Sequence, residues 1–94
     1  AHSRRRERFA RDFGATHFIA QSDVAEPAAA INDALGGPPE VVFEAVGLPG
    51  AIGKAMEYVA PRGTIIGLGF TTGSDSYSCA VALMKEVRLL FSVV

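Results

Sequence analysis

Short, largely apolar runs constrain the fold of this chain more than any other feature of its sequence. Residues 41–43 form a continuous apolar run, typical of a strand that a parallel sheet buries on both faces. A second buried strand is expected over residues 64–68, and a last apolar strand over residues 87–94. A further short strand is expected over residues 16–20. Stretches with helical spacing separate these strands, so the order of elements predicts an α/β fold with a parallel sheet and right-handed crossovers.

The first of the expected helices covers residues 3–13. Phe9 and Phe13 are four positions apart and share one face, which arginines flank. Gly14 follows as a residue that can take a positive φ and end the helix. The second helix begins at Ser22 or Asp23, either of which can cap it. This helix and two later ones are expected over residues 22–35, 52–59 and 81–85.

Composition limits the classes of protein to which the chain can belong. Its 94 residues allow one domain at most, and its net charge of −1 gives no electrostatic reason to expect a nucleic-acid or membrane partner. No run has the length of a membrane span, and no signal peptide is visible. Cys79 is the single cysteine, so no intrachain disulfide can form and the reducing cytoplasm is expected. The Cys and His residues lack the spacing of a metal site, so no metal is expected within these residues.

The candidate site residues directly follow the strands, because ligands of open parallel sheets bind outside the carboxyl ends of the strands. Ala45, Val46 and Gly47 follow the second expected strand, and Gly69 with Phe70 follow the third. These small or apolar exits suit a flat ring lying close to the backbone, but they carry no acid, base or nucleophile. The alternative is that the glycines only make tight turns.

Other residues and patterns give weaker signals. The Gly-x-Gly-x-x-Gly fingerprint of phosphate loops is absent. Glu44 ends a buried strand, where a hydrogen-bonded structural carboxylate is favoured over a catalytic base. His17 is interpreted as structural or exposed, and Lys85 with Glu86 as a solvated corner before the last strand.

Four segments together resemble a known family. They are ARDFGATHFI at residues 10–19, EVVFEAVG at 40–47, MEYVAPRGTIIGLG at 56–69 and KEVRLLFS at 85–92. In this order and spacing they are similar to the nucleotide-binding half of the medium-chain dehydrogenases, and specifically of the zinc-type alcohol and polyol dehydrogenases. The resemblance covers essentially the whole chain.

The resemblance implies a partial Rossmann fold. In the family the sheet has the strand order 3-2-1-4-5-6, and the expected strands of this chain correspond to strands 3 to 6. Strands 1 and 2, the glycine-rich loop and the catalytic zinc domain would then precede Ala1. Residues 1–94 are therefore expected to be an incomplete NAD(P)-binding domain without activity of its own, with zinc bound only in a longer parent protein.

The resemblance also assigns cofactor contacts at the start of the chain. Relatives specific for NAD carry an acid at the end of strand 2, and counting back from Gly14 places that position at Ala1. His2, Ser3 and Arg4 follow instead of a carboxylate, and cations near this position accommodate the 2′-phosphate of NADP. NADP is therefore favoured over NAD as the cofactor. The alternative is that the arginines are only the solvated face of a helix.

Two strand exits contact the rest of the cofactor by the same resemblance. The positions on the adenine and ribose side are Ala45, Val46 and Gly47. The positions on the nicotinamide side are Leu68, Gly69 and Phe70.

The last expected strand, residues 87–94, carries two further expectations from the resemblance. Val93 and Val94 match positions whose backbone reaches the nicotinamide carboxamide. In the family this strand is also the edge of the sheet and pairs with its copy in a dimer. A bare apolar edge would invite aggregation, so a homo-oligomer formed through this strand is expected.

The function that the resemblance implies is hydride transfer between an alcohol or polyol and NAD(P), with zinc in the absent domain polarising the substrate oxygen. Two alternatives stay open. A zinc-free quinone or enoyl reductase of the same superfamily would lack zinc ligands in its catalytic half. A stand-alone α/β binding module would have no activity and would fold cooperatively by itself.

Overall fold

The computed structural model of the chain describes residues 1–69 and 73–92. These residues form two compact units, residues 1–37 and residues 38–94, which are described separately below.

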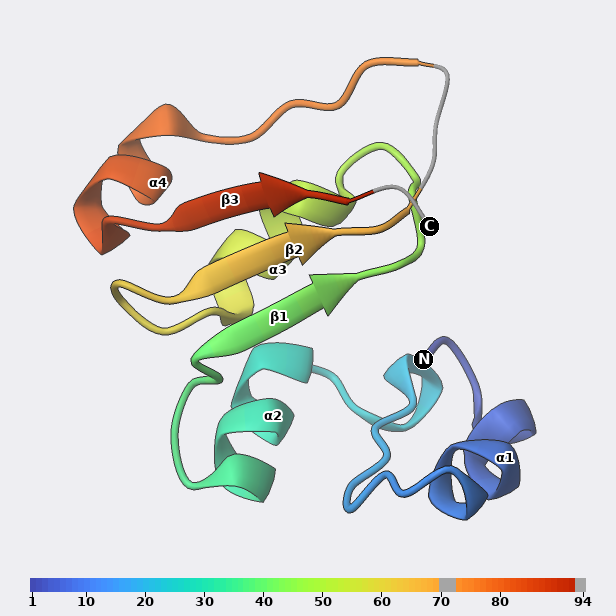
Figure 1. Ribbon diagram of the computed structural model, residues 1–94. Helices are drawn as coiled ribbons and strands as arrows, with labels where there is room; N and C mark the ends of the chain where they lie inside the picture. The colour runs from blue at the N-terminus through green and yellow to red at the C-terminus, as the bar shows by residue number, and fades with distance from the viewer. Residues whose placement is uncertain (70–72, 93–94) are drawn as a thin grey trace. The chain divides into compact units, whose positions relative to one another are not determined.

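The second unit is built on a three-stranded parallel sheet (Figure 1). Its strands are β1 (Val41–Glu44), β2 (Thr64–Gly67) and β3 (Arg88–Phe91), and they lie in the order β1-β2-β3. In the register of this sheet Val42 pairs with Ile65, and Ile65 with Leu89. The α/β class, the parallel pairing and three of the four expected strands are therefore confirmed.

Helices α3 (Ala51–Tyr58) and α4 (Cys79–Lys85) connect these strands, and α3 lies behind the sheet in Figure 1. The apolar stripe of α3 packs against β2, whose Ile65 is fully buried. Ala82 of α4 packs against the same group of side chains. The core members are Ile52, Ala55, Met56, Val59 and Ile65. One face of the sheet thus holds the hydrophobic core of this unit.

The opposite face of the sheet is not buried, so the expectation of burial on both faces is wrong for this unit. Phe43 is 63% exposed and Leu90 is 50% exposed, although both belong to uninterrupted apolar runs. Helices α3 and α4 both contribute to the core on the covered face of the sheet. Among the described residues of this unit, no second layer of helices covers the other face.

Lys85 holds the carboxyl end of α3, and its interpretation as part of a solvated corner is wrong. Its Nζ donates hydrogen bonds to the carbonyl oxygens of Met56, Glu57 and Val59, at 2.7, 3.1 and 2.9 Å. The last carbonyls of a helix have no partner within the helix and carry its negative dipole end. An ammonium group satisfies both needs at once, which ties the end of α4 to the end of α3.

The first unit begins with a short 3-10 helix, η1 (Arg4–Arg6), that continues into α1 (Glu7–Asp12). This pair matches the helix expected over residues 3–13, and Gly14 follows it with φ of 101°. The shared apolar face does not pack as expected, because Phe13 is 91% exposed.

Helix α2 (Pro27–Leu35) begins later than the sequence predicted. Residues 21–23 instead form a separate 3-10 turn, η2 (Gln21–Asp23). Pro27 occupies the first turn of α2, where a missing N–H costs nothing and φ is already helical. Gly36 then ends the helix in the left-handed conformation with φ of 77°.

The strand expected over residues 16–20 is not a strand in the structure. This segment does lie beside the first two residues: the amino group of Ala1 donates to the Ile19 carbonyl at 3.1 Å, and the Gln21 N–H donates to the Ala1 carbonyl at 2.7 Å. These two bonds have the slanted pattern of a parallel pair. One more bond follows, in which the Ser22 N–H donates to the His2 carbonyl at 3.0 Å. The pairing therefore involves only Ala1 and His2, which is too short for a strand ladder.

The last strand ends one side of the described sheet, as expected of an edge strand. Pairing of this edge with a second copy stays a prediction. None of the described helices has the length and hydropathy that crossing a membrane requires.

Replacing Lys85 with Met is expected to lower the free energy of unfolding by about 1–3 kcal/mol, because three helix-end carbonyls lose a charged donor. Urea unfolding followed by circular dichroism measures the change. Lys54→Met is the matched control, because Lys54 lies exposed on α3, the helix whose end Lys85 caps. An equal loss in both variants would contradict the capping role.

Candidate functional site

The carboxyl ends of β1 and β2 meet in a close contact between two glycines. The N–H groups of Leu68 and Gly69 both donate to the carbonyl oxygen of Glu44, at 2.7 and 3.0 Å. A Cβ placed on Gly69 would lie 2.3 Å from the Gly47 nitrogen and 2.5 Å from its Cα. Only glycine allows this approach, so the backbone is bare of side chains where the two strands end.

The Glu44 carboxylate fixes the turn that follows β1. Its Oε1 accepts hydrogen bonds from the N–H groups of Val46 and Gly47, at 2.7 and 2.9 Å. Glu44 is only 8% exposed, and Gly47 takes a positive φ of 75°. The hydrogen bonds correspond to the structural carboxylate that the sequence favoured at this position. Among the described residues no group donates to its other oxygen, Oε2, which faces Gly69.

Asp75 fills the amino end of α3. Its carboxylate accepts from the N–H groups of Gly50 at 2.7 Å, Ile52 at 3.3 Å and Ser76 at 2.7 Å. The hydrogen bond from the Gly50 backbone, followed by those from Ser76 and Ile52, holds the pKa of Asp75 below its ordinary value. A helix amino end is a common binding place for phosphate, but here the protein's own carboxylate occupies it.

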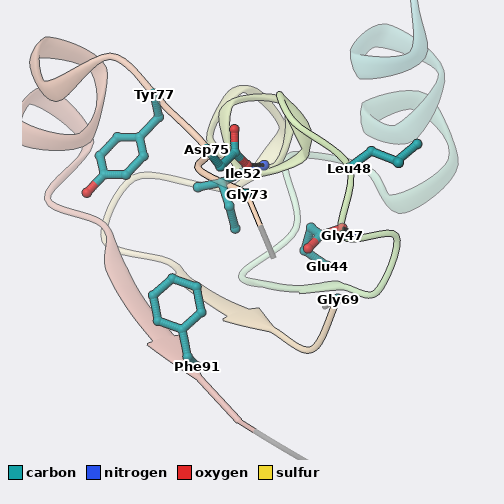
Figure 2. Close-up of a pocket in the computed structure, with 9 residues that line it drawn as sticks. All are labelled: Glu44, Gly47, Leu48, Ile52, Gly69, Gly73, Asp75, Tyr77 and Phe91. Atoms are coloured by element: carbon teal, nitrogen blue, oxygen red, sulfur yellow. Dashed lines mark hydrogen bonds between the residues drawn. The ribbon is translucent and has the colours of Figure 1, made fainter. Parts of the chain in front are cut away.

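These elements enclose a cavity of about 250 Å³ at the carboxyl edge of the sheet. Figure 2 shows Tyr77 and Phe91 on one side of it, and Glu44 with Gly47 and Gly69 on the other. The residues that line it are Glu44, Gly47, Leu48, Ile52, Gly69, Gly73, Asp75, Tyr77 and Phe91. Aromatic side chains, bare backbone and the absence of any lysine or arginine in this lining suit a flat, uncharged or cationic ring.

Phe91 takes its place beside the cavity because its neighbour in the sheet is a glycine. Gly67 pairs with Phe91 in the register of β2 and β3. A Cβ on Gly67 would lie 2.8 Å from Cδ1 of the phenyl ring. The ring therefore lies against the bare backbone of β2, with 73% of the residue exposed.

The structure brings some of the sequence-predicted residues to this cavity. Gly47 and Gly69 line it, whereas Ala45 and Val46 are exposed in the turn between Glu44 and Gly47. Leu68 comes directly before Gly69 and does not line the cavity. The remaining predicted contacts, Phe70, Val93 and Val94, lie outside the described residues.

Arg4, predicted to contact the cofactor, is already engaged within the first unit. Its guanidinium binds the carboxylates of Glu7 and Asp23, and the hydrogen bond to Glu7, with that to Asp23, raises the pKa of Arg4. Arg5 and Arg6 form no ion pair with any residue that the structure describes.

The other two residues predicted at the start of the chain, His2 and Ser3, lie at a surface hollow of the first unit. This hollow has a volume of about 380 Å³, and its lining also includes Arg5 and Arg6. Arg5 and Arg6 are therefore the cations that line this hollow with His2 and Ser3, and the cofactor contacts of His2, Ser3 and Arg4 stay predictions.

Sequence reasoning missed Asp75, Tyr77 and Phe91. Asp75 contacts Gly50, 25 positions earlier in the chain, and no local pattern pairs a loop carboxylate with a distant helix end. A usable signal existed for Phe91 alone, because a glycine in β2 opposite an aromatic residue in β3 indicates close packing.

The part of the chain that the structure describes holds no group of three or more His, Cys, Asp or Glu side chains that could bind a metal ion.

The sequence model of the zinc-binding dehydrogenases matches residues 1–94. The chain belongs to the zinc-binding dehydrogenase family. No curated protein matches it.

Solved structures of similar fold include several dehydrogenases. One is 2R,3R-butanediol dehydrogenase from Bacillus subtilis, with a TM-score of 0.87 and 21% identity over 98% of this chain and 26% of that one. A zinc-binding alcohol dehydrogenase domain protein from Burkholderia ambifaria has a TM-score of 0.84 and 23% identity over 99% and 25%. An alcohol dehydrogenase from E. coli CFT073, solved with NADH, has a TM-score of 0.82 and 21% identity over 98% and 27%. This family member thus spans about a quarter of the length of these relatives.

Replacing Gly69 with Ala in this member of the zinc-binding dehydrogenase family is expected to lower the free energy of unfolding by about 1–3 kcal/mol, because the new Cβ overlaps the backbone of Gly47. Gly53→Ala is the matched control. Its Cβ would meet only the Ser76 carbonyl oxygen, at 3.8 Å, and Ala in a helix is expected to stabilise it by about 0.5–1 kcal/mol. Thermal or urea unfolding measures both, and a neutral Gly69→Ala would rule out the close contact of the two strand ends.

Proposed function

We propose that residues 1–94 position the nicotinamide cofactor of a dehydrogenase that transfers hydride between an alcohol or polyol and NAD(P). Family membership over the whole chain supports the dehydrogenase class. The observation that carries the proposal is the cavity at the carboxyl ends of parallel strands, where this architecture binds nucleotides. Alcohol, butanediol and L-idonate dehydrogenases among the structural neighbours support an alcohol or polyol as the substrate.

The cavity of the second unit fits the nicotinamide end of the cofactor. A single Cβ would fill the space where Gly47 and Gly69 meet, so a ring can approach the backbone there. In this proposal Gly47 is assigned to the nicotinamide ring, whereas the resemblance implied a contact on the adenine and ribose side. Phe91 and Tyr77 supply aromatic surface against which a flat ring packs. Asp75 occupies the helix amino end, which makes the cavity unsuitable for a pyrophosphate.

The first unit fits the phosphate of NADP on the adenosine side. Arg5 and Arg6 carry charges that no described carboxylate neutralises, and they line a hollow with His2 and Ser3. Guanidinium groups bind phosphate with paired hydrogen bonds. NADP is the favoured cofactor on this ground. NAD is the alternative, because a relative of similar fold was solved with NADH.

The described residues hold no group of three or more side chains that could bind a metal ion. In this proposal zinc is therefore bound by other residues of the protein. When bound, zinc supplies a Lewis acid that polarises the substrate oxygen. The residues of this chain hold the nicotinamide ring in position and provide a surface that keeps water away from the ring. On its own the chain is therefore proposed to have no activity.

Replacing Arg5 and Arg6 together with Gln is expected to raise the Kd for NADPH by about 10- to 100-fold and to leave the Kd for NADH within about twofold, because only NADPH loses phosphate contacts. Fluorescence titration of the full-length protein with each reduced cofactor measures this. Arg8→Gln is the control, because Arg8 lies on α1 but does not line the hollow with His2 and Ser3. Equal weakening of both cofactors would exclude a 2′-phosphate site here.

Removal of zinc from the full-length protein by a chelator is expected to abolish alcohol oxidation, followed as NADPH absorbance, and to leave NADPH binding within about twofold. The physical reason is that the described residues, those of the cofactor cavity included, hold no group of three or more side chains that could bind a metal ion. Full turnover of a zinc-free protein would instead identify the quinone or enoyl reductase alternative.

A further inference from the structure

The charges around the cavity of Figure 2 are all of one sign. Two of its lining residues, Glu44 and Asp75, are carboxylates, and none is a lysine, arginine or histidine.

The cations of the second unit are engaged or face elsewhere. The Lys85 ammonium binds the carbonyls at the carboxyl end of α3. Arg62 pairs with Glu86 at 3.6 Å. Lys54 lines a different hollow, which it shares with residues of α3 and α4. Arg88 is the first residue of β3, and it is Phe91 at the other end of that strand that lines the cavity. No cation among the described residues of the second unit therefore lines the cavity beside the two carboxylates.

Backbone N–H groups hold both carboxylates in place. Glu44 accepts two such hydrogen bonds and Asp75 accepts three. Donors of this kind complement a negative charge, and they lower the pKa of Asp75, so this carboxylate is ionised at neutral pH.

We propose that this cavity distinguishes the two redox forms of the cofactor and binds the oxidised, positively charged nicotinamide ring in preference to the reduced one. The ring of NAD(P)⁺ carries one positive charge, and the ring of NAD(P)H carries none. Glu44 and Asp75 therefore attract the charged ring of NAD(P)⁺, whereas the ring of NAD(P)H offers no net charge to attract. The inference rests on the proposed function, because it requires the nicotinamide end to occupy this cavity.

The geometry provides variants that remove charge and keep the local structure. Both N–H groups that bind Glu44 donate to Oε1 alone, so a Gln side chain can retain both bonds. At Asp75 the two short bonds share Oδ1, so Asn loses only the 3.3 Å bond from Ile52.

The test measures Kd for NADP⁺ and for NADPH in the full-length protein and in Glu44→Gln, Asp75→Asn and the double variant. The ratio of Kd for NADP⁺ to Kd for NADPH is expected to rise about tenfold with Glu44→Gln, which is buried, and about threefold with Asp75→Asn, which solvent screens. Glu57→Gln is the matched control, since Glu57 lies exposed on α3 and does not line the cavity.

Three other outcomes are informative. If both cofactor forms weaken equally, the carboxylates act only by holding the two turns, and the electrostatic proposal is overturned. A ratio that moves no further than in Glu57→Gln overturns it as well. If the unmodified protein binds neither NADP⁺ nor NADPH and neither NAD⁺ nor NADH, the proposed function itself fails.

Discussion

The candidate site depends on one junction, where the ends of β1 and β2 join through Glu44. Its backbone carbonyl accepts from Leu68 and Gly69, and its carboxylate accepts from the turn that follows it. One buried residue therefore sets both the spacing of the two strand ends and the path of the chain beyond β1. The close packing of Gly47 on Gly69 accompanies this arrangement. Because the bare backbone there lines the cavity, the shape of the site depends on both the backbone carbonyl and the carboxylate of one residue.

Asp75 also lines the cavity, and it occupies the amino end of α3, where a phosphate could otherwise bind. In many nucleotide-binding proteins the amino end of a helix points at a phosphate. Here the N–H groups of Gly50 and Ile52 are bound by the protein's own carboxylate. The same contact anchors the loop that carries Tyr77 next to the cavity. One acid thus excludes anions from the helix end and places an aromatic wall, which supports a ring as the occupant.

The sequence predicted the features that arise from local patterns. Apolar runs located β1, β2 and β3, and glycines located the ends of α1 and α2. Burial on both sheet faces was predicted wrongly, because an apolar run records a preference for burial and does not show whether the covering layer lies within these residues. The strand expected before Gln21 failed for a related reason, since only two residues lie beside it and a strand needs a longer partner.

The site shows the same division between local and distant information. Gly47 and Gly69 were predicted because they directly follow strands, which is a property of the sequence. Asp75 was missed and Lys85 was misinterpreted because the helix-end groups that they bind lie 23 or more positions away. Both cap an end of α3, and a helix of eight residues leaves much of its backbone unpaired without such caps. Long-range capping therefore connects the stability of this short helix to the loop and strand that line the cavity.

The net charge of −1 conceals an uneven distribution that matches the proposed ligand. Five arginines lie within the first eleven residues, and two of them line a hollow that suits a phosphate. The cavity of the second unit carries two carboxylates and no cation. In oxidised NADP the 2′-phosphate of the adenosine is anionic and the nicotinamide ring is cationic. The hollow of the first unit, considered by itself, carries charge that complements the 2′-phosphate, and the cavity of the second unit carries charge that complements the oxidised ring.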